Sequence, residues 1–248
     1  EVERMEPPAP GDIPMLDEAV FDMQVLAERE TGGFSDLLTP LTHAYAAWLD
    51  EQAIRAGSLN DLDSYRAQAV AAVANGRETL RRMEAGITLI NADPQAAEAF
   101  RFANRAMWYQ RIRTIYAAQV RQGQEPDLKA IDVPHNRSWR PFQLAFVLLN
   151  LPGLVNPTHP ERSDPTQALA DLLWFPTGGG KTEAYLGVAA FAMAIRRLQR
   201  EVDGRSGLAG VTVIMRYTLR LLTLQQFQRA TTLMAACEMI RRNDPANW

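Results

Sequence analysis

The chain has 248 residues, of which 47% are hydrophobic, and its 26 basic and 29 acidic side chains give a formal net charge of −3. These proportions are ordinary for a globular protein, so they exclude a disordered chain and a broad basic surface for nucleic acid. The longest apolar stretch, residues 142–155, is too short to span a bilayer and is interrupted by Asn150 and Pro152. Because nothing resembles a signal peptide, we expect a soluble, cytoplasmic protein without membrane contact.

The sequence contains few cysteine and histidine residues that could form disulfides or bind metals. Cys237 is the single cysteine, which excludes an internal disulfide, and we expect it to be a buried structural thiol. His43, His135 and His159 are scattered without metal-ligand spacing. The sequence begins without an initiator methionine and ends directly after a predicted helix, so we expect it to be part of a longer protein.

The first half of the chain carries helix start and stop signals. Thr39 is predicted to cap a helix that ends at Gly57, with a proline in its first turn. A second helix is expected over about 60–89, with a break at a glycine as an alternative. A third is capped by Asp93, starts with the proline that follows, and ends at Gly123.

We divide the chain into a helical domain at 1–123, a linker at 124–138 and a second domain at 139–248. The linker is polar and contains proline, which marks a boundary. The third helix also carries an aromatic and basic run, which is interpreted as core packing with a solvated arginine face rather than as a stacking platform for single strands. The run consists of Phe100, Arg101, Phe102, Arg105, Trp108, Tyr109, Arg111 and Arg113.

The second half has a different pattern. Residues 171–175 and 211–215 are short apolar runs and are predicted to be buried strands, whereas 181–200 and 219–242 are predicted to be helices. Residues 202–210 are interpreted as a connection. The alternation of strand and helix is typical of an α/β fold with a parallel sheet.

A glycine-rich loop lies between the first predicted strand and the helix that follows. Residues 175–182, "FPTGGGKT", match the end of the phosphate-binding pattern G-x-x-x-x-G-K-[ST], with Phe175 in place of its first glycine. The loop backbone and the helix N-terminus would cradle phosphates, Lys181 would reach the β- and γ-phosphates of ATP, and the Thr182 hydroxyl would hold Mg²⁺. The alternative, a flexible turn with an incidental lysine, does not explain the flanking strand and helix.

Two further stretches resemble motifs of superfamily 2 helicases and translocases. "WRPFQ", residues 139–143, is similar to an element in which a glutamine reads adenine, and an amide can both donate to and accept from that base. The alternative is an ordinary helix N-terminus with Gln143 in solvent. The predicted nucleotide site consists of Arg140, Gln143, Thr177, Gly178, Gly179, Gly180, Lys181, Thr182 and Glu183.

The second stretch follows the second predicted strand and resembles the segment that holds the nucleic-acid backbone in that superfamily. Arginines, hydroxyls and helix N-termini are the groups that position phosphates. The alternative is a helix cap at Thr218 with surface arginines. The predicted DNA-binding residues are Arg216, Thr218, Arg220 and Gln225, with Gln226 as an alternative to the last.

Taken together, these stretches resemble the large helicase-like subunit of the bacterial DISARM phage-defence system, from about residue 37 onward and including Phe175. The resemblance implies the first part of a RecA-like domain, ATP and Mg²⁺ as cofactors, DNA as a partner and a large protein partner subunit. The acidic motif II and the arginine finger of such motors do not occur after Arg216, and the pairs Asp17–Glu18 and Asp50–Glu51 lie too early and on the wrong elements.

We therefore expect an ATP-dependent DNA helicase or translocase that acts in antiphage defence. The other hypotheses are a superfamily 2 motor that acts on RNA, and a nucleotide-gated DNA-binding scaffold that organises a partner protein. A full-length sequence with an intact motif II and arginine finger would favour a motor over a scaffold.

Overall fold

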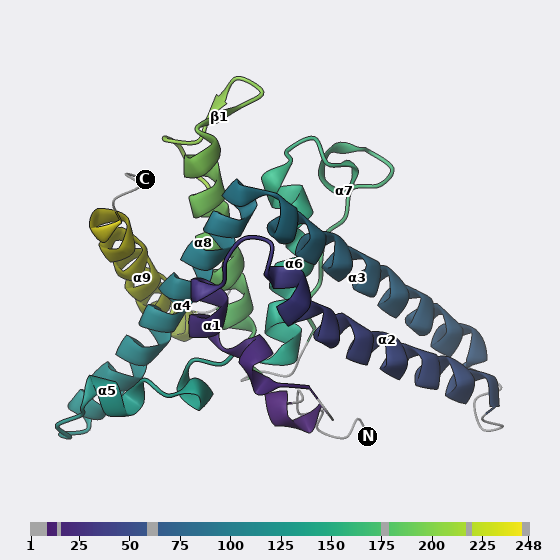
Figure 1. Ribbon diagram of the computed structural model, residues 1–248, viewed down its shortest axis with the longest axis horizontal. Helices are drawn as coiled ribbons and strands as arrows, with labels where there is room; N and C mark the ends of the chain where they lie inside the picture. The colour runs from purple at the N-terminus through teal and green to yellow at the C-terminus, as the bar shows by residue number, and fades with distance from the viewer. Residues whose placement is uncertain (1–8, 14–15, 59–63, 175–178, 217–219, 245–248) are drawn as a thin grey trace.

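The computed structural model describes residues 9–13, 16–58, 64–174, 179–216 and 220–244, except for the side chains of Pro10 and of residues 220–223. Helices dominate this part of the chain (Figure 1). The elements are η1 (Pro10–Asp12), η2 (Glu18–Phe21), α1 (Met23–Glu28), α2 (Phe34–Ser58), α3 (Arg66–Ala92), α4 (Pro94–Arg121), α5 (Leu128–Ile131), η4 (Pro134–Asn136), α6 (Pro141–Val155), α7 (Pro160–Ser163), α8 (Lys181–Gln199), β1 (Glu201–Val202), β2 (Arg205–Ser206) and α9 (Arg220–Asn243).

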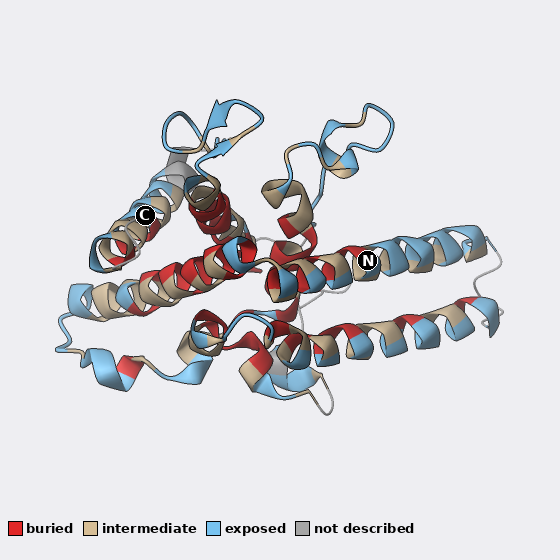
Figure 2. Cartoon of the chain, turned by 45° about the horizontal axis from the view of Figure 1, so that its top comes forward, coloured by how far each residue is buried: buried red, intermediate tan, exposed pale blue. Residues whose placement is uncertain are grey.

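Helix α4 lies at the centre of the molecule. It contacts α1, α3, α8 and α9, while α6 packs between α3 and α8. Helices α2 and α3 pair along their length and project away from the rest as a hairpin (Figure 1). Figure 2 shows that the buried residues gather on α4, α6 and α8 and at the inner end of the hairpin, whereas its outer end is exposed.

The cap predicted for α4 is confirmed. The Asp93 carboxylate accepts hydrogen bonds from the backbone N–H groups of Gln95 and Ala96, and Pro94 occupies the first helical position. The aromatic residues of this helix pack as interpreted, since Phe100 and Phe102 are both buried.

The predicted start of α2 is wrong by more than a turn. The helix begins at Phe34, so Pro40 lies inside it although proline cannot donate the helical hydrogen bond. Phe34 is fully buried with its ring edge-on to Phe100, and the Ser35 N–H donates to the Asn91 side chain. Burial of an aromatic side chain and a cap supplied by α3 therefore outweigh the local proline signal.

The α/β prediction, a RecA-like domain with a parallel sheet, is wrong for the described residues. Neither residues 171–174 nor 211–216 form a strand, and the one sheet in this part of the chain is the antiparallel pair of β1 and β2. Leu172 and Ile214 are 85% and 86% exposed. An apolar run becomes a strand only when a neighbouring backbone accepts its hydrogen bonds, and the described residues provide no such neighbour.

The residues interpreted as a connection contain this hairpin. At its turn, Asp203 and Gly204 have φ angles of 52° and 72°, as a two-residue turn between right-twisted strands requires. The dipeptide Asp-Gly is the usual sequence signal for this turn, so the hairpin was predictable.

No helix in the described ranges has both the length and the apolar character needed to cross a bilayer.

Candidate nucleotide-binding site

The start of α6 holds the described end of the glycine loop. Gln143 is buried, its Oε1 accepts from the Arg140 N–H at 2.8 Å, and its Nε2 donates to the Gly180 carbonyl at 2.8 Å. Arg140 itself donates from Nη1 to the Gly179 carbonyl at 3.3 Å. Two residues predicted from the sequence therefore lie against the loop, and Gln143 is enclosed rather than in solvent.

Gly180 needs to be glycine for two reasons. Its φ of 89° lies in the left-handed region, which side chains disfavour, and a Cβ atom there would stand 2.8 Å from the Gln143 Nε2. Gly180 is also the residue that precedes α8, so this conformation directs the loop into the helix. Thr177 and Gly178 lie outside the described residues.

Lys181 and Thr182 are the first two residues of α8 and are half-buried. The first N–H groups of a helix have no partner within the helix, so they and the helix dipole favour an anion at this end. Both residues therefore lie at the N-terminus of α8, where the sequence pattern predicts that phosphate and Mg²⁺ bind. These roles stay predictions. The described residues contain no group of three or more His, Cys, Asp or Glu side chains that could hold a metal ion.

Glu183 is enclosed one residue further along α8. Its side chain is 12% exposed, its Oε1 accepts from Arg229 on α9 at 2.9 Å, and its Oε2 is buried without a hydrogen-bond partner. The Arg111 side chain on α4 is half-buried and donates to the Asn136 carbonyl at 2.7 Å.

Three arginines act on one another at this position. Burial lowers the pKa of Arg111, the Glu183 carboxylate opposes that shift, and the charges of Arg140 and Arg229 add to it. Arg111, Arg140 and Arg229 are thus near enough to interact electrostatically, and Glu183 is the one carboxylate that acts on Arg111, so positive charge exceeds negative charge around it. An anion such as a phosphate would be attracted to this surplus.

The motifs gave no indication of Arg111 or Arg229. Arg111 was interpreted as part of a solvated face, and Arg229 lies well past the predicted DNA-binding segment. Both reach the site because α4 and α9 pack beside α8, which is a long-range contact without a local sequence signal.

The predicted DNA-binding residues lie before and at the start of α9. Arg216 and Gln225 are exposed, while the Oε1 of Gln226 is buried without a hydrogen-bond partner. Thr218 and the side chain of Arg220 lie outside the described residues. Arg229, one turn after Gln225, is the residue that contacts Glu183, so α9 connects the predicted DNA-binding segment with the helix of the glycine loop.

Comparison with known proteins adds one relative. No protein-family model matches the chain. Over 257 aligned residues, which include 99% of the chain, it is 37% identical to the DISARM protein DrmA of Bacillus paralicheniformis. The chain is similar to a DISARM protein over nearly its whole length. It spans 21% of that protein, which is the share to which the similarity applies.

Proposed function

We propose that the full-length protein is an ATP-dependent DNA helicase or translocase that serves bacterial phage defence as a component of a DISARM system. The similarity to a DISARM protein supports the role in defence. The positions of Lys181 and Thr182 behind a left-handed glycine support ATP as the source of energy. A large partner subunit belongs to the same proposal, since DISARM is a multi-protein system.

The observation that carries the nucleotide assignment is the way the loop is held. Gln143 and Arg140 bind successive carbonyls of the glycine loop, so those carbonyls turn toward α6. These two bonds fix the backbone of Gly179 and Gly180 at the N-terminus of α8, the end that favours an anion because of the helix dipole. A backbone with outward N–H groups at a helix N-terminus is suited to phosphate oxygens.

In this proposal each residue has a separate task. Lys181 would neutralise charge on the phosphates of ATP, and the Thr182 hydroxyl would hold Mg²⁺. ATP supplies the phosphoryl group whose transfer to water drives movement on DNA. Arg140 and Gln143 keep the loop in position, and Arg111 and Arg229 add positive charge from neighbouring helices.

The test is the Lys181→Ala variant of the full-length protein. We expect DNA-stimulated ATP hydrolysis to fall by about 10²-fold or more, because the variant removes a charge aimed at the transferred phosphate. Lys129, exposed on α5, provides a matched control, and Lys129→Ala should retain normal turnover. A folded Lys181→Ala protein with normal turnover would show that the loop is not the ATP site.

The same assay separates the alternative functions. ATP hydrolysis that is stimulated by RNA but not by DNA would indicate a motor that acts on RNA. Binding of ATP and DNA without turnover in the wild-type protein would indicate a nucleotide-gated scaffold.

A further inference from the structure

A second cationic feature lies at the other end of α8 from the glycine loop. There the chain turns back through β1 and β2 (Figure 1), and together with the segment between α6 and α7 it borders a half-open cavity of about 240 Å³. Four arginines line it: Arg162, Arg196, Arg200 and Arg205. We call this feature the arginine cavity.

The charges of these arginines are not neutralised within the described part of the chain. None of the four forms an ion pair there, and no carboxylate lines the cavity; Glu201 and Asp203 of the hairpin are exposed outside it. Arg196 donates to the Val211 and Ser206 carbonyls and to the Thr212 hydroxyl, and Arg162 donates to the Gly153 carbonyl. These acceptors are uncharged, so they satisfy N–H groups without cancelling the positive charge.

Compensation of the helix dipole explains only part of this arrangement. Arginines in the last turn of a helix stabilise its negative end, which applies to Arg196 and its neighbour Arg197. Arg162 and Arg205 come from α7 and β2, so the dipole of α8 does not account for them. Arg200 has a φ of 59° as the C-cap of α8, where its N–H donates to the Arg196 and Arg197 carbonyls, so the end of the helix sets its position.

The size of the cavity limits what can occupy it. Pockets for small molecules usually measure about 300–1,000 Å³ and are mostly apolar. This cavity is smaller and has charged walls, which suits one phosphate group better than a whole nucleotide. Guanidinium groups bind phosphate well because their planar fork matches its oxygens.

The chain itself connects the arginine cavity with the predicted DNA-binding segment. Val211 and Thr212 line the cavity, and Arg216 follows four residues after Thr212. Four residues span at most about 14 Å, which corresponds to about four nucleotides along one DNA strand. A strand that contacts Arg216 would therefore pass within reach of the cavity, which favours a nucleic-acid phosphate over the carboxylates of an acidic protein as the ligand.

We propose that the arginine cavity binds a backbone phosphate of DNA, as a contact separate from the ATP site and additional to Arg216. This inference rests on the DNA binding included in the proposed function. Arg200 lies just before the hairpin and Arg205 lies in it, and both are exposed. The inference assigns these two residues as the ones that bind the phosphate.

The experiment is a salt titration of DNA binding by the full-length protein without nucleotide. It compares the wild type with the double variant Arg200→Ala/Arg205→Ala on two unrelated duplexes. The slope of log K against log[salt] should become shallower by about 0.9 for one lost phosphate contact, and by the same amount on both sequences. Arg200→Lys/Arg205→Lys keeps the charge and should keep most of the slope.

A control variant removes the same charge elsewhere. Arg113 and Arg121 are exposed on the far half of α4, and Arg113→Ala/Arg121→Ala should leave the slope unchanged. Thermal unfolding of each variant shows whether the hairpin substitutions disturb the fold. If Arg200→Ala/Arg205→Ala does unfold, Arg200→Gln/Arg205→Gln removes the same charges while keeping longer side chains, and its slope should become shallower by the same amount; an unchanged slope would overturn the inference.

The outcomes distinguish this inference from the proposed function. If the wild type binds DNA and the alanine variant has the same slope and affinity, the cavity is not a DNA contact and the proposed function stands. Loss of binding to a protein partner with an intact DNA slope would also overturn the inference. If the wild type shows no salt-dependent DNA binding, both DNA assignments are wrong, while the Lys181→Ala test of ATP hydrolysis still decides the nucleotide site.

Discussion

At the scale of single residues, Trp139 fixes the relation between the helices that carry the candidate site. Its indole is buried and donates from Nε1 to the Asn104 side chain on α4 at 2.8 Å. It also lies against Gly187 of α8, where a Cβ atom would stand 2.7 Å from the indole Cη2 and 3.2 Å from Val147. The absence of a side chain at Gly187 lets α8 approach α6, and this approach places the glycine loop against Gln143.

The variant Gly187→Ala should lower the melting temperature. Alanine favours a helix by about 1 kcal/mol over glycine, but overpacking a core costs about 1–3 kcal/mol. Gly153, in α6, has open space around its Cα, so Gly153→Ala should keep or raise the melting temperature. Scanning calorimetry of both variants is the measurement, and equal stabilisation by both would contradict the packing described for Trp139.

Cys237 is expected to react slowly with thiol reagents. Burial raises the pKa of its thiol to about 12, so at pH 8 only about one molecule in ten thousand carries the reactive thiolate. In the unfolded chain the thiol ionises near its ordinary pKa, so stability should decrease as the pH rises from about 9 toward 12. Cys237 is half-buried in α9. Alkylation rates in native buffer and in urea measure this difference, and similar rates in both would contradict the raised pKa.

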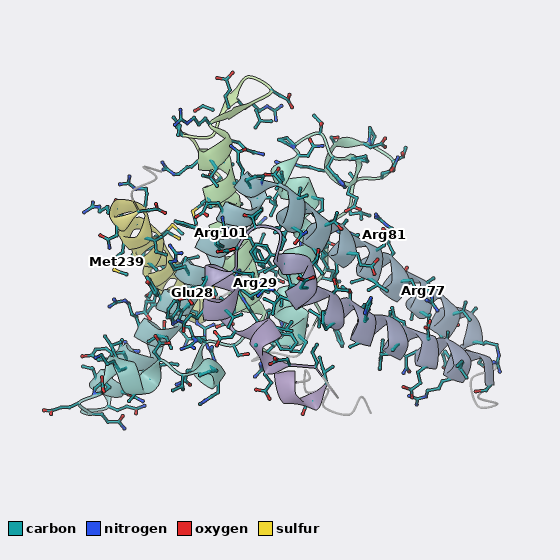
Figure 3. All side chains as sticks on the ribbon, in the orientation of Figure 1. Glu28, Arg29, Arg77, Arg81, Arg101 and Met239 are labelled. Atoms are coloured by element: carbon teal, nitrogen blue, oxygen red, sulfur yellow. The ribbon has the colours of Figure 1, made fainter. Side chains whose placement is uncertain are left out.

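At the scale of elements, an ion-pair network ties α3 to the segment that leads into the glycine loop. The Arg82 guanidinium forms a two-point contact with the Asp171 carboxylate and donates from Nε to Glu161 of α7 at 2.8 Å. Arg81, labelled with Arg77 in Figure 3, contacts the other oxygen of Glu161. Asp171 is four residues before Phe175, so α3 holds the chain shortly before the loop begins.

We expect Arg82→Ala to destabilise the protein by about 2–3 kcal/mol, since the Arg82 side chain is 10% exposed and its loss leaves Asp171 without its partner and Glu161 with Arg81 alone. Arg77→Ala is the matched control. Its pair with Asp50 is at least half exposed on both sides, so its removal should cost less than about 1 kcal/mol. Urea unfolding of the two variants provides the comparison, and equal midpoints would show that the network contributes no more than a surface pair.

At the scale of the whole molecule, the net charge of −3 requires DNA binding to depend on local positive sites. The predicted segment after residue 215 and the arginine cavity are two candidates for such sites, and residues 211–216 connect them. Helix α9 starts in this segment and reaches Glu183 through Arg229, so the same helix joins the proposed DNA contact to the proposed ATP site.

Replacing Arg216 and Arg220 together by alanine in the full-length protein should weaken DNA binding by similar factors on unrelated sequences. Each lost phosphate contact should reduce the salt slope by about 0.9 on a duplex, because fewer counterions are released. Affinity for ATP without DNA should change little, since the glycine loop is a separate segment. An unchanged salt dependence of DNA binding would show that the segment from Arg216 to Arg220 is an ordinary helix start.

Effects of the two sites should add if one strand contacts both. A variant with all four substitutions, at Arg216, Arg220, Arg200 and Arg205, should lose the sum of the two slope changes.

The sequence by itself determined those features that depend on neighbouring residues. The cap at Asp93, the start of a helix directly after the glycines, and the Asp203–Gly204 turn are set by hydrogen bonds and backbone angles within a few positions. Such local patterns can be read along the chain, which is why the position of Lys181 and Thr182 on a first helical turn was predictable.

Only the tertiary structure decided what is buried and which distant residues meet. Phe34 starts a helix early because Phe100 covers it, and Leu172 stays exposed because no neighbouring strand pairs with its segment in the described chain. Arg229 meets Glu183, and Arg111 lies near enough to interact with that carboxylate, only through the packing of α4 and α9 beside α8. Burial and electrostatic contact require a partner from elsewhere in the chain. The apolar or charged character of a residue does not show whether that partner is present.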